Sequence, residues 1–331
     1  VKMKDYKPIL NLLETEVAIK FVKDNFEKLL GKKLELTRVS APLFVIPETG
    51  LNDNLNGYER AVRFDIKAIG KDVEIVQSLA KWKRMALKKY NFEHSKGLYT
   101  DMNAIRRDED LDLLHSAYVD QWDWEKIISK NERTYSYLKK IVSKIYAVIL
   151  KTADLVTKKY PELTFDLPKD ITFISTKELE KRYPTYSRKE RENAITKEYK
   201  AVFLYQIGWP LSDGSSHDGR AADYDDWNLN GDIILYNDVI DRAYEISSMG
   251  IRVDEDSLVK QLEAKNEIYK LNNPYCQSIL KKELPYTIGG GIGQSRLCMF
   301  FLKKAHIGEV QSSVWSEEDI ESLAKQNIHL L

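Results

Sequence analysis

Residues 287–297, TIGGGIGQSRL, constrain the fold more than any other stretch, because four glycines fall within five residues and an arginine follows them. A backbone without side chains lets another group approach closely. A P-loop needs Gly-Lys-Ser/Thr after its glycines, and a dinucleotide fingerprint opens the first βα unit of a fold. This run has Gly-Gln-Ser-Arg and lies near the C-terminus, so it fits neither. It is either a turn that packs a strand against a helix, or a strand that carries a nucleotide before a helix presenting Arg296, whose planar cation suits a base and phosphates.

A second stretch, residues 98–125, is predicted to form a strand, a polar loop and a returning strand. Arg106 ends the first strand. The returning strand alternates with period two, with polar residues on one face and tryptophans on the other: Gln121, Asp123 and Glu125 against Trp122 and Trp124. The alternation indicates a sheet with a ligand cleft above a packed core, although an ordinary amphipathic edge strand would show the same pattern.

The rest of the chain mixes strand pairs with helices in uneven order, which is typical of an α+β fold. The apolar spacing predicts a helix over 9–30 that Gly31 ends, and a strand over 34–43 that runs into Pro42. The remaining predicted helices cover about 79–89, 132–159, 176–183 and 187–198, two more lie near 254–282, and a last one starts at about Gln294. The remaining strands cover 59–69, 72–78, 171–175, 201–208, 231–237 and 244–254.

Charge and composition limit the partners. Lys+Arg and Asp+Glu both number 51, so the net charge is zero, which argues against a long nucleic-acid partner. Cys276 and Cys298 are too few for a disulfide framework and lack metal-ligand spacing. No apolar run approaches the roughly 20 residues that span a bilayer, and the first residues lack the apolar core of a signal peptide. We therefore expect no membrane partner and a cytoplasmic location.

Together, three segments resemble the motifs of class II aminoacyl-tRNA synthetase catalytic domains. Residues 8–42 match the long helix and the strand ending at proline, here Pro42. Arg106 matches the arginine of the second motif, and residues 289–296 match the glycine-rich strand and helix of the third. The resemblance implies a central antiparallel sheet flanked by helices.

A closer resemblance, over nearly the whole chain, is to the ammonia-dependent asparagine synthetases, the aspartate–ammonia ligase family. It is carried by VQSLAKWKR, GLYTDMNAIRRDED, YVDQWDWE, VFLYQIGWPLSDGSSHDGRAADYDDW, LNGDIILYN, YEISSMGIRVD and TIGGGIGQSRL. It implies one catalytic domain over residues 1–331 that forms a homodimer through the first motif. One departure is that Trp227 is followed directly by NLNGD, where the family usually has several more residues. Either the loop is absent or residues are missing from the sequence, so any role of that loop stays unassigned.

The resemblance implies a reaction in which ATP converts aspartate into a β-aspartyl-adenylate, ammonia displaces AMP, and asparagine and pyrophosphate are formed. Arg106 would neutralise the α-phosphate and Arg296 would lie over the adenine. The other expected nucleotide contacts are Leu114, His115, Ser116, Val119 and Gly293. Asp232 and Glu245, on successive strands, would hold Mg²⁺, unless they are surface carboxylates on a hairpin.

For the amino-acid substrate, the resemblance to aspartyl-tRNA synthetase implies a cationic pair, Lys83 and Arg252. We expect this pair to hold the α-carboxylate of a reversed aspartate, unless Lys83 lies on a solvated helix face. The further substrate-binding candidates are Ser78, Gln121, Asp123, Asp225 and Ser248. Asp53, in LNDNLNG, is the candidate that binds ammonium and accepts its proton; the alternative is a simple turn.

Three functional hypotheses remain open at this point. The first is the ligase, using free ammonia because neither cysteine lies near the start, where glutamine-dependent synthetases carry their nucleophile. The second is an aspartyl- or asparaginyl-tRNA synthetase-like enzyme. The third is a non-catalytic synthetase paralogue, which would require an eroded catalytic set.

Overall fold

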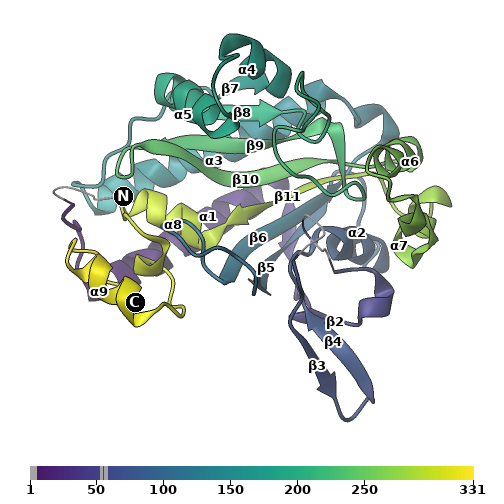
Figure 1. The fold of residues 1–331 in the computed structure, drawn as a ribbon, viewed down its shortest axis with the longest axis horizontal. Coiled ribbons are helices and arrows are strands. Elements are labelled where there is room, and N and C mark those ends of the chain that lie inside the picture. The colour runs from purple at the N-terminus through teal and green to yellow at the C-terminus, as the bar shows by residue number, and fades with distance from the viewer. Residues whose placement is uncertain (1–5, 53–54, 56–58) are drawn as a thin grey trace.

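A computed structural model describes residues 6–52, 55 and 59–331, and its centre is an eight-stranded sheet (Figure 1). In spatial order its strands are β1 (Leu36–Arg38), β5 (Gly97–Ile105), β6 (Tyr118–Ile127), β11 (Thr287–Gly293), β10 (Arg242–Arg252), β9 (Asp225–Asn237), β8 (Ala201–Tyr205) and β7 (Thr172–Ser175). The α+β fold is confirmed. The expectation of an antiparallel sheet is right for the inner strands and wrong at both edges, where β1 pairs with β5 and β7 with β8 in parallel. Parallel neighbours require a long crossover, and residues 39–96 and 176–200 provide it.

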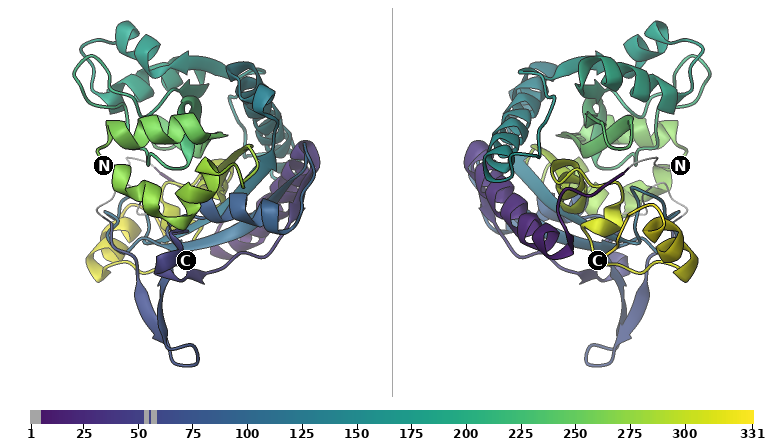
Figure 2. Two further views of the ribbon diagram at one scale, coloured as in Figure 1. Left: turned by 90° about the vertical axis from the view of Figure 1, so that its right-hand side faces the viewer. Right: turned by 90° about the vertical axis from the view of Figure 1, so that its left-hand side faces the viewer.

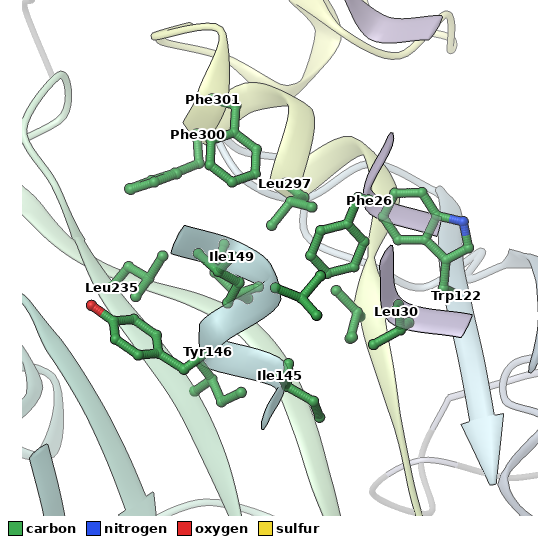
Figure 3. Close-up of a cluster of buried hydrophobic side chains, with 14 of the residues drawn as sticks. Phe26, Leu30, Trp122, Ile145, Tyr146, Ile149, Leu235, Leu297, Phe300 and Phe301 are labelled. Atoms are coloured by element: carbon green, nitrogen blue, oxygen red, sulfur yellow. The ribbon is translucent and has the colours of Figure 1, made fainter. Parts of the chain in front are cut away.

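Three helices cover one face of this sheet: α1 (Leu12–Leu34), α3 (Tyr135–Lys159) and α8 (Gln294–Phe301). Figure 3 shows their apolar side chains meeting those of the strands. Phe26 of α1 stacks on Trp122 of β6 with ring centroids 4.9 Å apart, and Trp122 and Trp124 are both fully buried. The tryptophan face of the returning strand is therefore the core face, as predicted.

The end of α1 differs from the sequence expectation. Gly31 does not end the helix, which continues to Leu34 and closes with Glu35 in the left-handed region at φ 59°. Leu30 and Leu34 are both fully buried, so the helical spacing of apolar residues continues past Gly31.

The opposite face of the sheet is covered less evenly (Figure 2). Helix α2 (Ala80–Lys89) packs on β6 and β11, and α5 (Arg188–Tyr199) packs on β8, β9 and β10. The other helices are α4 (Thr176–Arg182), α6 (Glu255–Ala264), α7 (Pro274–Leu280) and α9 (Glu317–Ala324), with 3₁₀ turns at Pro47–Thr49, Lys130–Glu132, Ile268–Asn272 and Ile307–Glu309.

A separate three-stranded sheet projects from the body (Figure 1). It consists of β2 (Phe44–Val45), β4 (Lys71–Ile75) and β3 (Arg63–Ile66) in that order, and it confirms the predicted pairing of the strands around 59–69 and 72–78. Strand β9 runs through Trp227 and Asn228 without interruption. In the described part of the chain, no helix has both the length and the apolar character to cross a membrane.

Candidate active site

A cavity of about 500 Å³ lies over the polar face of β6, β10 and β11. It collects almost all the residues that the sequence singled out: Ser78, Lys83, Arg106, Leu114, His115, Ser116, Val119, Gln121, Asp123, Asp225, Glu245, Ser248, Arg252, Gly293 and Arg296. Asp232 does not line it, and Asp53 lies outside the described residues. Segments far apart in the sequence thus form one site.

The inner end of the cavity is a buried charge network. Lys83 is 1% exposed, so the solvated-face alternative is wrong; its Nζ lies 2.8 Å from Asp123 Oδ1 and donates to the carbonyl oxygen of Gly290 at 3.0 Å. Arg252 donates to both oxygens of Glu125, with Nε at 3.0 and 3.1 Å and Nη2 at 2.8 Å, and its Nη1 bonds Asp225. Each buried charge therefore has a partner, as burial requires.

Burial and these partners set the ionisation of the network. Burial lowers the pKa of Lys83, although Asp123 opposes the shift. Burial alone would raise the pKa of Glu125, but the Arg252 guanidinium outweighs it and holds that pKa below its ordinary value. Burial raises the pKa of Asp225 despite the same guanidinium. The network is a polar socket of paired cationic and acidic side chains, which suits a substrate that carries both an ammonium and a carboxylate.

The glycine run forms β11, between β6 and β10, and its glycines make room for this network. A Cβ on Gly289 would lie 2.6 Å from the carboxyl carbon of Glu125 and 2.7 Å from Arg252 Nη2. A Cβ on Gly291 would lie 3.0 Å from Asp123 Oδ1 and also strike the Gln121 amide. The interpretation as a strand next to a ligand cavity is therefore favoured over a packing turn.

At the other end of the cavity, Arg296 is held by its neighbours. Its Nη2 lies 2.8 Å from His115 Nε2, and its Nη1 donates to the carbonyl oxygen of Glu245 at 3.1 Å. His115 Nδ1 lies 2.8 Å from Asp112 Oδ1. Because a guanidinium only donates, His115 Nε2 must accept, and Nδ1 carries the proton toward Asp112. Arg106, on the same wall, lies 3.9 Å from Glu109, and its Nε has no hydrogen-bond partner among the described residues.

The floor at this end uses residues that the sequence analysis missed. Asp120 accepts from Ser295 Oγ at 2.7 Å and from Gln311 Nε2 at 3.2 Å, and Lys23 from α1 lies 3.1 Å from it. The backbone N–H of Ile307 donates to Leu113 at 2.8 Å. Residues 306–313 thus fasten the loop of the second motif. No periodicity in the sequence identifies residues 306–313 as part of the site; only their position in the folded chain does.

The expected metal ligands lie on neighbouring strands but in different surroundings. Glu245 is exposed and lines the cavity, whereas Asp232 is 5% exposed and bound by Arg220, with Nη2 2.6 and 2.5 Å from its two oxygens. Burial raises the pKa of Asp232 to about 7, against the pull of Arg220. No group of three or more His, Cys, Asp or Glu side chains suited to a metal occurs within the described ranges. Two carboxylates beside a nucleotide still fit Mg²⁺, which commonly takes one or two carboxylates plus phosphates.

Solved structures that share this fold include class II aminoacyl-tRNA synthetases. Asparaginyl-tRNA synthetase of Entamoeba histolytica, in complex with asparaginyl-adenylate, superposes with a TM-score of 0.64 at 14% identity, over 92% of this chain and 68% of that one. Asparaginyl-tRNA synthetase of Pyrococcus horikoshii, also complexed with asparaginyl-adenylate, gives 0.65 at 16% identity, over 91% and 70%. The chain has the class II synthetase fold.

Sequence comparison resolves the family within that fold. The family model described as aspartate-ammonia ligase matches residues 13–327. The aspartate–ammonia ligase of Ruminiclostridium cellulolyticum is 62% identical over 332 residues, covering 100% of this chain and 99% of the relative. That of Fusobacterium nucleatum is 63% identical over 326 residues, covering 98% and 99%. This chain belongs to the aspartate–ammonia ligase family, and it is a ligase.

Proposed function

We propose that the cavity joins ammonia to the side-chain carboxylate of L-aspartate, consuming ATP and releasing AMP and pyrophosphate. The observation that carries the proposal is that one cavity unites a buried socket for an amino acid, around Lys83 and Arg252, with two arginines for a nucleotide, Arg106 and Arg296. Family membership favours the ligase over a tRNA synthetase, and the presence of all these residues speaks against an eroded paralogue.

A carboxylate is a poor electrophile, so it must first be activated. In the proposed reaction the β-carboxylate of aspartate attacks the α-phosphorus of ATP, and pyrophosphate leaves. Arg106 stabilises the charge that develops on the α-phosphate, and Arg296 fixes the base. Ammonia then attacks the β-acyl carbon, and AMP leaves with the bonding electrons. The protein's contribution is positioning and electrostatic stabilisation.

Aspartate is oriented, in this proposal, by the inner network. Its α-carboxylate lies between Lys83 and Arg252, and its ammonium faces Asp123 and Gln121, so the β-carboxylate points toward Arg106. Ser78, Asp225 and Ser248 line the remaining wall. A crystal with bound asparagine tests the orientation: an α-carboxylate remote from both cations would refute it.

Asp232 and Glu245 are proposed to hold Mg²⁺, which would neutralise the phosphate chain of ATP. Turnover should then stop when EDTA removes divalent ions and return with added Mg²⁺; full activity without divalent ions would contradict the assignment. Asp53 is proposed to deprotonate ammonium. Asp53→Asn should weaken ammonia use far more than aspartate-dependent adenylate formation, whereas an equal loss in both half-reactions would count against that role.

The proposal also covers the domain organisation, location, oligomeric state and partners of the protein. We propose that the chain acts as one catalytic unit, in the cytoplasm, as a homodimer, with neither a nucleic acid nor a membrane as partner. The exposed apolar side chains of α1, among them Leu13 at 75% and Val17 at 54% exposure, support the dimer. Light scattering of the purified protein tests it: a monomer at micromolar concentration would refute the dimer.

One assay separates the functional hypotheses. The protein is incubated with ATP, aspartate and either ammonium or tRNA, and AMP, asparagine and aminoacyl-tRNA are followed. AMP with asparagine supports the ligase. Aminoacyl-tRNA would support the synthetase-like alternative, and absence of turnover would support the paralogue.

A further inference from the structure

The contact between Arg220 and Asp232 has an unusual geometry for an ion pair. One nitrogen, Nη2, bridges both carboxylate oxygens at 2.6 and 2.5 Å. The two side chains are 9% and 7% exposed, so water screens the pair little. The two nitrogens of a guanidinium can each take one oxygen of a carboxylate. Here a single nitrogen takes the position in which a chelated cation would lie.

Arg220 also stands between Asp232 and the cavity. Arg220, Glu245 and Asp218 line the cavity, whereas Asp232 does not. Asp232 lies opposite Ser248 in the register of β9 and β10, and Ser248 does line the cavity. Removing the guanidinium would therefore open the Asp232 carboxylate to the space beside Glu245.

The remaining contacts of the Arg220 head group are local. Nη1 donates to the carbonyl oxygen of Gly219 at 2.9 Å and to Asp218 Oδ2 at 3.1 Å, both within two residues of Arg220. Its Nε is buried without a hydrogen-bond partner among the described residues. Among the described residues, Asp232 is thus the hydrogen-bond partner that links this head group to the sheet, whereas Glu245 and Tyr224 interact with it electrostatically.

We propose that Arg220 is a replaceable cation: it occupies Asp232 while the site holds no nucleotide, keeps free divalent ions away from it, and moves onto the phosphates when a metal–ATP complex enters. The proposal rests on the metal role proposed above for Asp232 and Glu245. An arginine suits the exchange because its fork matches phosphate as well as carboxylate, and it stays charged in both positions. The enzyme would then bind the divalent ion with ATP and not before it.

The test measures binding of Mn²⁺ alone, by electron paramagnetic resonance of the free ion, without nucleotide. Wild type is compared with Arg220→Met, which removes the cation, and with Arg220→Lys, which keeps a charge but loses the fork. The matched control is Lys189→Met, which removes another cavity-lining cation that does not contact Asp232. We expect Arg220→Met to bind one Mn²⁺ about tenfold or more tightly than wild type, because a neighbouring unit charge opposes the metal by at least that factor. Arg220→Lys should fall between them, and the control should match wild type.

A second measurement follows the nucleotide. Arg220→Met should bind a non-hydrolysable ATP analogue with Mn²⁺ more weakly than wild type, because the phosphates lose their guanidinium. Equal Mn²⁺ affinity in wild type and Arg220→Met would overturn the proposal. So would tight Mn²⁺ binding that survives in the double variant Arg220→Met, Asp232→Asn, since the ion would then lie elsewhere.

Folding and function are checked separately. Thermal unfolding shows whether Arg220→Met folds; if it does not, Arg220→Lys decides, and wild-type Mn²⁺ affinity in that variant overturns the proposal. The metal dependence of wild-type turnover is measured independently. Turnover that needs no divalent ion would refute the proposed metal role, even where the Mn²⁺ titration shows the expected competition.

Discussion

The same substitution at two positions of β11 should lower stability at one position and weaken aspartate binding at the other. Gly289 and Gly291 lie on one strand and face the same side, since both would direct a Cβ toward the polar side chains of β6. The Cβ of Gly289→Ala would approach the Glu125 carboxyl carbon at 2.6 Å, well inside the 3.4 Å of ordinary contact. Glu125 cannot retreat, because it is fully buried and bound by Arg252 and by Thr287 Oγ1 at 2.6 Å.

The expected loss of stability follows from the buried ion pair that the substitution must disrupt. Disrupting a buried ion pair costs about 3–5 kcal/mol, and the lower chain entropy of alanine returns up to about 1 kcal/mol. We therefore expect Gly289→Ala to lose about 3 kcal/mol, a large share of the roughly 5–15 kcal/mol typical of a folded protein. In Gly291→Ala the new methyl meets the end of the Gln121 side chain, which is partly exposed in the cavity and can move. It also lies 3.0 Å from Asp123 Oδ1, a contact that a shift of a few tenths of an ångström relieves. Its stability should stay within about 1 kcal/mol of wild type, while its KM for aspartate rises about tenfold.

Urea unfolding followed by tryptophan fluorescence measures the stability, and steady-state kinetics measure the KM. The two variants are each other's control, because they make one chemical change on one strand. An unchanged unfolding midpoint in Gly289→Ala, or the same loss of stability in both variants, would refute the reasoning.

Three further changes probe other parts of the site. Lys83→Met should lower kcat/KM for aspartate about 100-fold or more, because Asp123 and the substrate lose their cation, and should change the KM for ATP far less; equal changes for both substrates would contradict the assignment. His115→Ala should raise the KM for ATP about fivefold, because Arg296 loses the acceptor at 2.8 Å, whereas the control His94→Ala, whose Nε2 lies 2.8 Å from Glu132 instead, should match wild type. Burial lowers the pKa of His306 from 6.5 to about 4, so the unfolded chain binds more protons in that window and stability falls as pH drops from about 6.5 to 4, by up to about 3 kcal/mol. His306→Asn keeps an acceptor for the Gly308 N–H and should remove most of that decline; parallel pH–stability curves would exclude His306 as its source.

Part of the site could be predicted from local signals, and the remaining assignments came from the family resemblance. Period-two alternation placed Trp122 in the core and Asp123 in the cavity, and the glycine run placed Arg296 after a bare strand. The long-range pairs could not be predicted, because alternation gives the face of a strand and not the distance between strands. Arg252 was assigned to the substrate without its partner Glu125, and Asp232 was assigned to metal without Arg220 in front of it. The parallel edge strands were not predicted for the same reason, since the three-stranded sheet and α2 separate β1 from β5 along the chain.

The fastening of the second-motif loop by residues 306–313 has a consequence for synthesis on the ribosome. Ile307 donates to Leu113, and Gln311 bonds Asp120, so these residues complete the proposed nucleotide site, whose other parts precede them in the chain. A nascent chain that has not yet released residues 306–313 from the ribosome would lack the contacts that hold Leu113 and Asp120 beside the proposed nucleotide site. Competence to bind ATP should therefore appear only after residues 306–313 have been translated and have packed against Leu113 and Asp120.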